Sequence, residues 1–270
     1  MNRIDATFAK LREQGTSAFV AYIAAGDPTL EATFDIVEAM ERWGVDIVEL
    51  GVPFSDPMAD GTVNQLAAER ALKAGATVAG VLDLVRRIRK GSEIPIVLYN
   101  YMNPIYTYGF GRFLVDAQDA GVDGLLLLDL PPEEQDANDE LRSATELRFI
   151  RLIAPTTPVD RIAKIAARAE GFIYYVSREG VTGERTDIAA DLDAQLALIR
   201  RFAKVPVVVG FGVSRPEQAA AIAAKADGVV VGSAIVRQIA SHGASPDLIE
   251  RLGETVRPLV EATRHGIAKA

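Results

Sequence analysis

The chain has 270 residues, of which 49% are hydrophobic and 24% are charged, and its formal net charge is −8 at pH 7. This balance is ordinary for a globular protein with a large core, and the negative charge argues against nucleic acid or an anionic membrane as the main partner. The absence of cysteine excludes disulfides, thiolate metal sites and cysteine nucleophiles.

Acid–base chemistry near neutral pH must fall mainly to carboxylates, because the chain has only two histidines. His242 and His265 lie too far apart in the sequence to have the spacing of a metal-ligand pair. The N-terminus lacks the apolar core of a signal peptide, and no apolar run approaches the ~20 residues that a membrane helix needs. We therefore expect a cytoplasmic protein without a metal ion.

Eight short apolar runs recur along the chain, at residues 18–24, 46–50, 94–99, 124–128, 148–153, 172–176, 206–209 and 228–231. The runs are continuous rather than alternating, which is typical of strands buried on both faces. Amphipathic segments such as 30–43, 78–90 and 189–202 lie between them. Eight β-then-α units predict an α/β protein of the (β/α)8 TIM-barrel class, as a single domain over residues 1–270. A doubly wound open sheet is the alternative, but it more often has fewer strands.

Extra helices are predicted outside the regular units. The segment between the second and third runs is long enough for a loop, a helix around residues 63–73 and a further helix from Val78. A closing helix is predicted to start near Ser245-Pro246. Three strands are preceded by an aspartate that could orient the incoming strand, namely Asp46, Asp123 and Asp227.

The segment ELGVPFSDPMADG, residues 49–61, places three carboxylates at and after the end of the second strand. Active sites of barrels lie at the C-terminal ends of the strands. Two carboxylates there can divide the work, so that Glu49 moves protons with a raised pKa while Asp60 stays ionised. The alternatives are a structural ion pair for Glu49, a helix N-cap for Asp60 and a turn former for Asp56.

Glycine-containing segments follow the last two strands, as GFGVS at residues 210–214 and GSA at residues 232–234. Glycines let the backbone approach an anion, and helix N-terminal amides donate to it, so these loops predict a phosphate site. The polar loop 177–187 is a candidate lid, in which Gly180, Thr182 and Gly183 could complete the site. Tight turns without a ligand are the alternative.

Aromatic residues near the strand ends favour a flat apolar ligand. Tyr22 lies in the first strand, Tyr99 ends the third, and Tyr174 and Tyr175 lie in the sixth. The pocket wall could be completed by Leu98, Leu126, Leu128 and Ile153. Core packing is the alternative role for each of them. Phosphate donors at one end and a carboxylate pair at the other fit an aromatic substrate with a phosphorylated tail.

The run VELGVPFSDPMADG, residues 48–61, resembles the signature of the tryptophan synthase α subunit family. Further segments are similar to that family in the same order, namely YIAAGDP (22–28), YMNPIY (101–106), DLPPEE (129–134), SREGVTG (177–183) and GFGV (210–213). The resemblance covers nearly the whole chain.

This resemblance implies a lyase of tryptophan biosynthesis that cleaves indole-3-glycerol phosphate to indole and glyceraldehyde 3-phosphate by a retro-aldol reaction. It implies that Glu49 is the general acid–base, that Asp60 accepts the indole N–H, and that Thr182 folds the lid toward Asp60. The substrate-binding residues expected on this basis are Tyr22, Tyr99, Tyr174, Thr182, Gly183, Phe211, Gly212, Gly232 and Ser233.

The resemblance also implies a protein partner. Indole would pass to a separate pyridoxal-phosphate β subunit in an α2β2 heterotetramer, and this chain would need no cofactor of its own. The residues expected to face the β subunit are Pro53, Asp56, Asn103, Asp129 and Pro131.

The chain departs from the family at three positions. Ala24 stands where threonine is common, and Thr62 replaces a proline, which should loosen the turn after Asp60. Asn64 replaces an apolar residue next to the indole, and a polar group there costs affinity unless it is paired.

Three other functions stay open at this point. The chain could be a stand-alone indole-3-glycerol phosphate lyase that releases free indole, or a mainly non-catalytic activator of the β subunit. A phosphate-binding barrel isomerase would need a catalytic aspartate or cysteine at the end of the first strand, where the chain offers Asp27.

Overall fold

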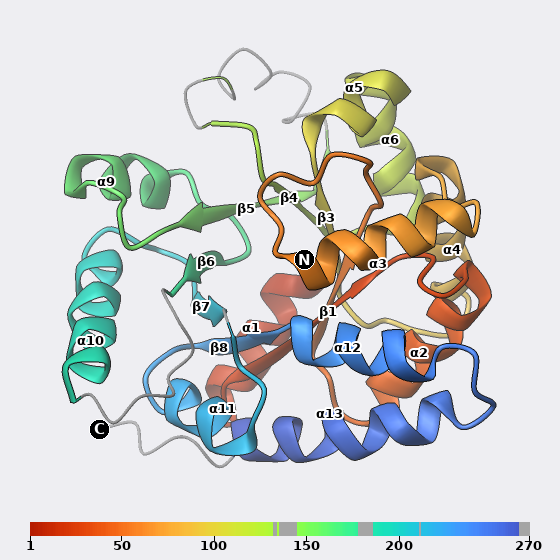
Figure 1. The fold of residues 1–270 in the computed structure, drawn as a ribbon. Coiled ribbons are helices and arrows are strands. Elements are labelled where there is room, and N and C mark those ends of the chain that lie inside the picture. The colour runs from red at the N-terminus through yellow and green to blue at the C-terminus, as the bar shows by residue number, and fades with distance from the viewer. Residues whose placement is uncertain (132–133, 135–144, 178–185, 211, 265–270) are drawn as a thin grey trace.

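A computed structural model describes residues 1–131, 134, 145–177, 186–210 and 212–264. Eight parallel strands close into a barrel in sequence order, with β1 paired to both β2 and β8 (Figure 1). The strands are β1 (Ala18–Ala24), β2 (Ile47–Gly51), β3 (Ile96–Asn100), β4 (Gly124–Leu127), β5 (Arg148–Ile153), β6 (Ile173–Val176), β7 (Val207–Gly210) and β8 (Gly228–Val231). The TIM-barrel prediction is confirmed, and the open-sheet alternative was wrong because the first and last strands pair.

Helices surround the barrel and cover one of its ends. They are α1 (Arg3–Glu13), α2 (Leu30–Arg42), α3 (Thr62–Lys73), α4 (Val78–Ile88), α5 (Met102–Tyr108), α6 (Phe110–Ala120), α9 (Val159–Ala167), α10 (Thr186–Arg200), α11 (Pro216–Ala223), α12 (Ser233–His242) and α13 (Leu248–Arg264). The closing helix starts at Leu248, slightly later than predicted, and α12 precedes it as a separate helix.

Both faces of β1, β2, β4, β7 and β8 are buried along their whole length, which explains why these apolar runs do not alternate. In β1, Phe19, Ala21 and Ile23 pack in the layer between the strands and the surrounding helices. Ala18 and Val20 point the other way and pack inside the barrel. Side chains therefore alternate along a strand between the helix-facing layer and the barrel interior. Near the C-terminal end of each strand, the interior-facing side chains reach the mouth of the barrel.

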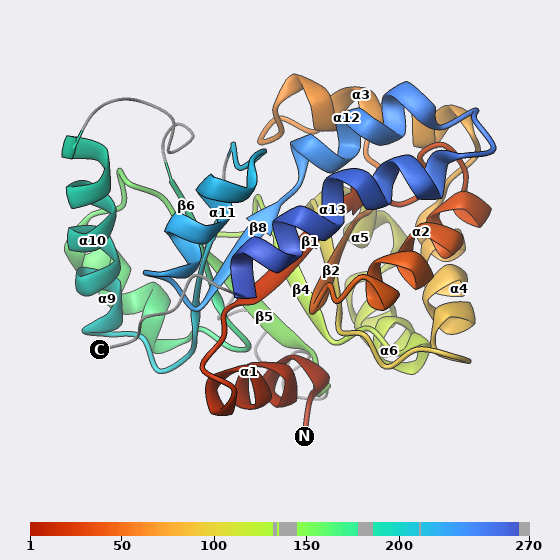
Figure 2. The same ribbon diagram turned by 90° about the horizontal axis from the view of Figure 1, so that it is seen from below.

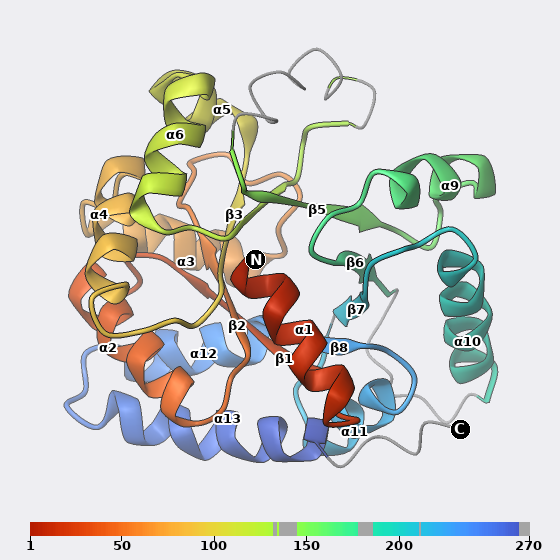
Figure 3. The ribbon, with the colours of Figure 1, turned by 180° about the vertical axis from the view of Figure 1, so that it is seen from behind.

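Helix α1 closes the N-terminal end of the barrel. Ile4, Phe8 and Leu11 pack among the interior residues, and the rings of Phe8 and Phe172 lie 5.7 Å apart. Figures 2 and 3 show α1 across this end, and Figure 2 shows α3 and α12 together at the opposite end. The interior of the barrel is therefore covered by α1 at this end, and its mouth lies at the end where α3 and α12 lie.

Carboxylates connect pairs of strands at the closed end. Asp46, which precedes β2, accepts a hydrogen bond from the backbone N–H of Phe19 in β1 (2.7 Å). The same arrangement recurs in the pairs β3–β4, β5–β6 and β7–β8, with Asp123 and Ile96 (2.8 Å), Glu170 and Phe149 (3.0 Å), and Asp227 and Val207 (2.9 Å). The prediction that these aspartates orient strands is confirmed, and Glu170 extends the set.

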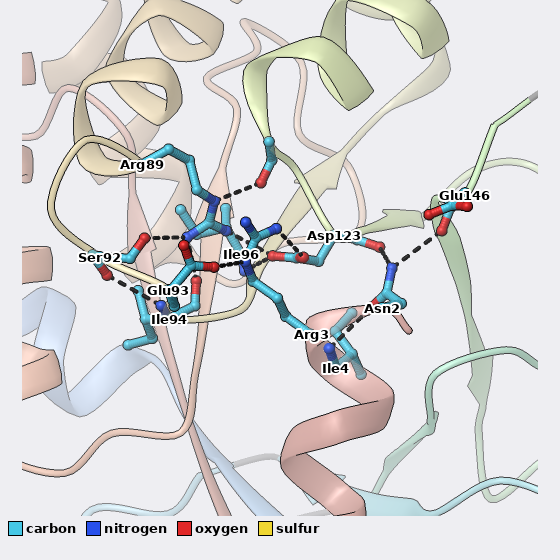
Figure 4. A network of polar contacts seen from close by, with 11 residues as sticks. Asn2, Arg3, Ile4, Arg89, Ser92, Glu93, Ile94, Ile96, Asp123 and Glu146 are labelled. Atoms are coloured by element: carbon cyan, nitrogen blue, oxygen red, sulfur yellow. Dashed lines mark hydrogen bonds and ion pairs between the residues drawn. The ribbon is translucent and has the colours of Figure 1, made fainter.

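Asp123 also anchors the N-terminal helix and the loop before β3 (Figure 4). Its carboxylate accepts from Arg89 (2.7 Å) and Arg3 (3.1 Å), and its backbone carbonyl accepts from Asn2 (2.9 Å). Burial raises the pKa of Asp123, while the Ile96 amide and the two arginines act in the opposite direction. The cluster fixes α1 against the barrel.

Among the described residues, no helix is both long enough and apolar enough to cross a membrane. The same residues contain no group of three or more His, Cys, Asp or Glu side chains arranged to hold a metal ion.

Candidate active site

A cavity of about 610 Å³ opens at the C-terminal end of the strands. It falls within the ordinary size range of small-molecule sites. Eight of the predicted substrate and catalytic residues line it, namely Tyr22, Glu49, Asp60, Tyr99, Tyr174, Gly212, Gly232 and Ser233. Residues far apart in the sequence therefore meet at one mouth, as the barrel prediction required.

Glu49 is a buried carboxyl that has no partner in the part of the chain that the structure describes. It lies in β2 beside Tyr22 of β1, only 1% of its surface is exposed, and neither carboxylate oxygen has a hydrogen-bond partner among the described residues. Burial raises the pKa of Glu49 to about 8. The ion-pair alternative was therefore wrong, and Glu49 is poised to bind and release a proton near neutral pH.

Asp60 is held in place by two tyrosine hydroxyls. Tyr99 donates to Oδ1 and Tyr101 donates to Oδ2, each at 2.8 Å, while the Asn64 amide lies 3.4 Å from Oδ1. Burial, together with the nearby Asp60 carboxylate, raises the pKa of both tyrosines, so they remain neutral donors. The N-cap alternative for Asp60 was wrong, because α3 has Gly61 as its N-cap and no side-chain cap.

The interior tyrosines require glycines on the neighbouring strands. A Cβ atom on Gly51 would lie 2.5 Å from the Tyr22 hydroxyl oxygen, and one on Gly210 would lie 2.4 Å from that of Tyr174. Burial raises the pKa of Tyr22 and of Tyr174 well above the usual value. Gly210 thus has a packing role in addition to its place in a glycine-rich loop.

The predicted apolar wall is correct only in part. Leu128 lines the cavity together with Leu152, which the sequence reasoning missed. Leu98 and Ile153 point outward into the layer beneath the helices, and Leu126 lies deeper in the barrel. Counting back from Tyr99 would have placed Leu98 on the outer face, because side chains of a strand alternate between its faces.

The loops after β7 and β8 reach the cavity where a phosphate site was predicted. Gly212, Gly232 and Ser233 line it, and α12 begins at Ser233 without a side-chain cap. Thr182, Gly183 and Phe211 lie outside the described residues. Arg237, which sequence reasoning missed, also lines the cavity. Its position four residues after Ser233 in a helix was the available signal.

The predicted interface residues do not line the cavity. Asp56, Asn103, Asp129 and Pro131 are exposed, whereas Pro53 is buried within this chain. Asp129 accepts a hydrogen bond from the backbone N–H of Met102 (2.8 Å), which joins the loop after β4 to the start of α5.

Asp27 does not behave as a free catalytic group. Its carboxylate accepts two hydrogen bonds from Arg70 of α3, at 2.8 and 2.7 Å, and it does not line the cavity. The isomerase alternative therefore loses the residue on which it depended.

Comparison with known proteins agrees with this geometry. The family model described as "Tryptophan synthase alpha chain" matches residues 8–264. The chain belongs to the tryptophan synthase alpha chain family. Members of this family are lyases that act on indole-3-glycerol phosphate, and this is the chain's activity.

Similar proteins match over essentially their full length. The tryptophan synthase alpha chain of Opitutus terrae is 50% identical over 98% of this chain and 100% of its own. That of Geobacter sulfurreducens is 50% identical over 99% of both chains. A crystal structure of the alpha subunit from Legionella pneumophila is 39% identical, with a TM-score of 0.89 over 97% of this chain and 98% of its own.

Proposed function

We propose that the chain cleaves indole-3-glycerol phosphate with Glu49 as the acid–base group. The bond between indole C3 and the glycerol chain breaks while a proton is added to C3 and the adjacent glycerol hydroxyl loses one to become a carbonyl. One carboxyl that gives and takes a proton can serve both transfers. The observation that carries this proposal is the isolated, buried Glu49 with a pKa of about 8.

Asp60 is proposed to accept the indole N–H and to stabilise the positive charge that develops on the ring. The Tyr99 and Tyr101 hydroxyls occupy one acceptor position on each oxygen. A carboxylate has about four such positions, so the indole N–H can still be accommodated. A fixed carboxylate stabilises developing charge because it needs no reorganisation during the reaction.

The phosphate of the substrate is proposed to bind the loops after β6, β7 and β8. Gly212, Gly232 and Ser233 supply backbone and hydroxyl donors, with Thr182, Gly183 and Phe211 as further expected contacts. The N-terminus of α12 adds favourable dipole and amide donors. Tyr22, Tyr99 and Tyr174 would contact the aromatic part of the substrate.

Replacement of Glu49 tests the chemistry directly. We expect E49Q to lower kcat by about 10² to 10⁴-fold, because the side chain keeps its size but cannot transfer the proton. Indole release from indole-3-glycerol phosphate is the measurement. E13Q, which changes an exposed carboxylate of α1, is the matched control and should retain wild-type turnover. Near-normal turnover by E49Q would show that another group carries the proton.

The partner is proposed to be a β subunit in an α2β2 heterotetramer in the cytoplasm. In support, the segments after β2, β3 and β4 leave the strands at the end of the barrel where the cavity opens, and Asp56, Asn103, Asp129 and Pro131 are exposed in them. Met58 and Tyr106 add exposed apolar surface there, at 90% and 76% exposure. Buried Pro53 would contribute by shaping its loop.

Turnover with and without a β subunit separates the remaining functions. We expect cleavage by the chain alone that rises when a β subunit is added, with a mass corresponding to two copies of each chain. Unchanged turnover and no complex would favour a stand-alone lyase. Strong activation of β with negligible cleavage would favour the activator role, against which the intact Glu49 and Asp60 argue.

A further inference from the structure

Among the described residues that line the cavity, Arg237 has the one cationic side chain. The acidic side chains there are those of Glu49 and Asp60. It lies in α12, one helical turn after Ser233, so the two residues share a face of the helix. Helical side chains lean toward the N-terminus. The Arg237 side chain therefore leaves the helix on the side of the turn that contains Gly232 and Ser233.

Arg237 is exposed and forms no hydrogen bond or ion pair with another described residue. Other arginines of the fold are committed to partners, such as Arg70 to Asp27, Arg89 to Asp123 and Arg264 to Asp46. A guanidinium that has no partner among the described residues and lies at the edge of a ligand cavity is available to an anion.

We propose that Arg237 binds the phosphate of the substrate and makes the cavity selective for a phosphorylated tail. This inference rests on the proposed function of the same site. Backbone amides at Gly212 and Gly232 offer hydrogen bonds but no net charge, whereas the chain as a whole carries −8. A guanidinium supplies the missing charge and a planar pair of donors that matches phosphate oxygens.

The effect of Arg237 on KM and kcat follows from the position of the phosphate, which lies away from the reacting bond. A bond to the phosphate is the same in the ground state and in the transition state, because the reacting bond lies at the indole end of the substrate. Loss of such uniform binding raises KM and leaves kcat unchanged.

The test compares R237Q, R237K and the control R12Q, which removes an exposed charge from α1 at the closed end of the barrel. For R237Q we expect a rise on the order of 10-fold in KM for indole-3-glycerol phosphate and in the inhibition constant of inorganic phosphate. R237K should recover part of both, and R12Q should match the wild type. Turnover of indole glycerol, which lacks the phosphate, should be the same in all four proteins.

The two proposals fail in different ways. If the wild type cleaves the substrate but R237Q keeps its KM and its phosphate inhibition, the role of Arg237 is wrong and the proposed function stands. A fall in kcat without a change in KM would also overturn it, since Arg237 would then act on the reacting end. If the wild type does not cleave the substrate, the proposed function is wrong, and calorimetric titration with inorganic phosphate still decides whether Arg237 binds it.

Discussion

Glu49 and Asp60, the proposed acid–base group and the proposed charge-stabilising carboxylate, have different surroundings. Glu49 is surrounded by barrel walls and has no described partner, so burial raises its pKa to about 8. Asp60 accepts hydrogen bonds from the hydroxyls of Tyr99 and Tyr101. The sequence predicted both acids and a division of work between them, but not the hydrogen bond from Tyr101, because Tyr101 meets Asp60 only through folding.

The raised pKa of Glu49 predicts a pH-dependent cost in stability. The folded protein holds this proton up to about pH 8, whereas an ordinary glutamate, as in the unfolded chain, releases it near pH 4.5. Between these values the unfolded state binds fewer protons, so the free energy of unfolding falls as pH rises. We expect E49Q to be more stable than the wild type by about 2 to 4 kcal/mol at pH 8 and nearly equal at pH 4.5.

Urea denaturation at the two pH values measures this difference. E13Q is again the control, because Glu13 is exposed at the end of α1. An equal difference between E49Q and the wild type at both pH values would contradict the assigned pKa.

At the scale of elements, the site depends on how α3 is attached to the barrel. Arg70 of α3 holds Asp27 in the loop after β1, and the Asp27 side chain is 1% exposed. This bond fixes the helix that follows the Asp60 loop. The start of α3 was predicted to within one residue, since the helix begins at Thr62. The pairing of Arg70 with Asp27 could not be predicted, because no local sequence pattern links two residues so far apart in the chain.

Removal of Arg70 should therefore destabilise the fold. R70M leaves the Asp27 carboxylate buried without its partner, at a cost of about 2 to 3 kcal/mol after allowance for the partial exposure of Arg70. Urea denaturation measures the loss, and the double variant D27N/R70M should recover part of it because no charge is left buried. R70M with wild-type stability would show that water satisfies Asp27 as well as Arg70 does.

At the scale of the whole molecule, one end of the barrel is structural and the other end holds the candidate site. The N-terminal end is closed by α1 and by carboxylate bonds, and the C-terminal end holds the cavity. The strands were predictable because burial on both faces leaves continuous apolar runs such as 18–24. The place of Arg237 in the cavity was harder to predict. It depends on the direction in which the side chain leaves α12, and α12 reaches the site only when the barrel closes.

The strand-linking carboxylates at the closed end have a consequence for how such a barrel can be divided. Asp46, Asp123, Glu170 and Asp227 each join an odd-numbered strand to the next even-numbered one. The smallest piece that contains a complete bond of this kind is a two-stranded quarter of the barrel. Duplication, exchange or recombination in whole quarters keeps every such bond within one piece, whereas a cut inside a quarter separates the carboxylate from its amide.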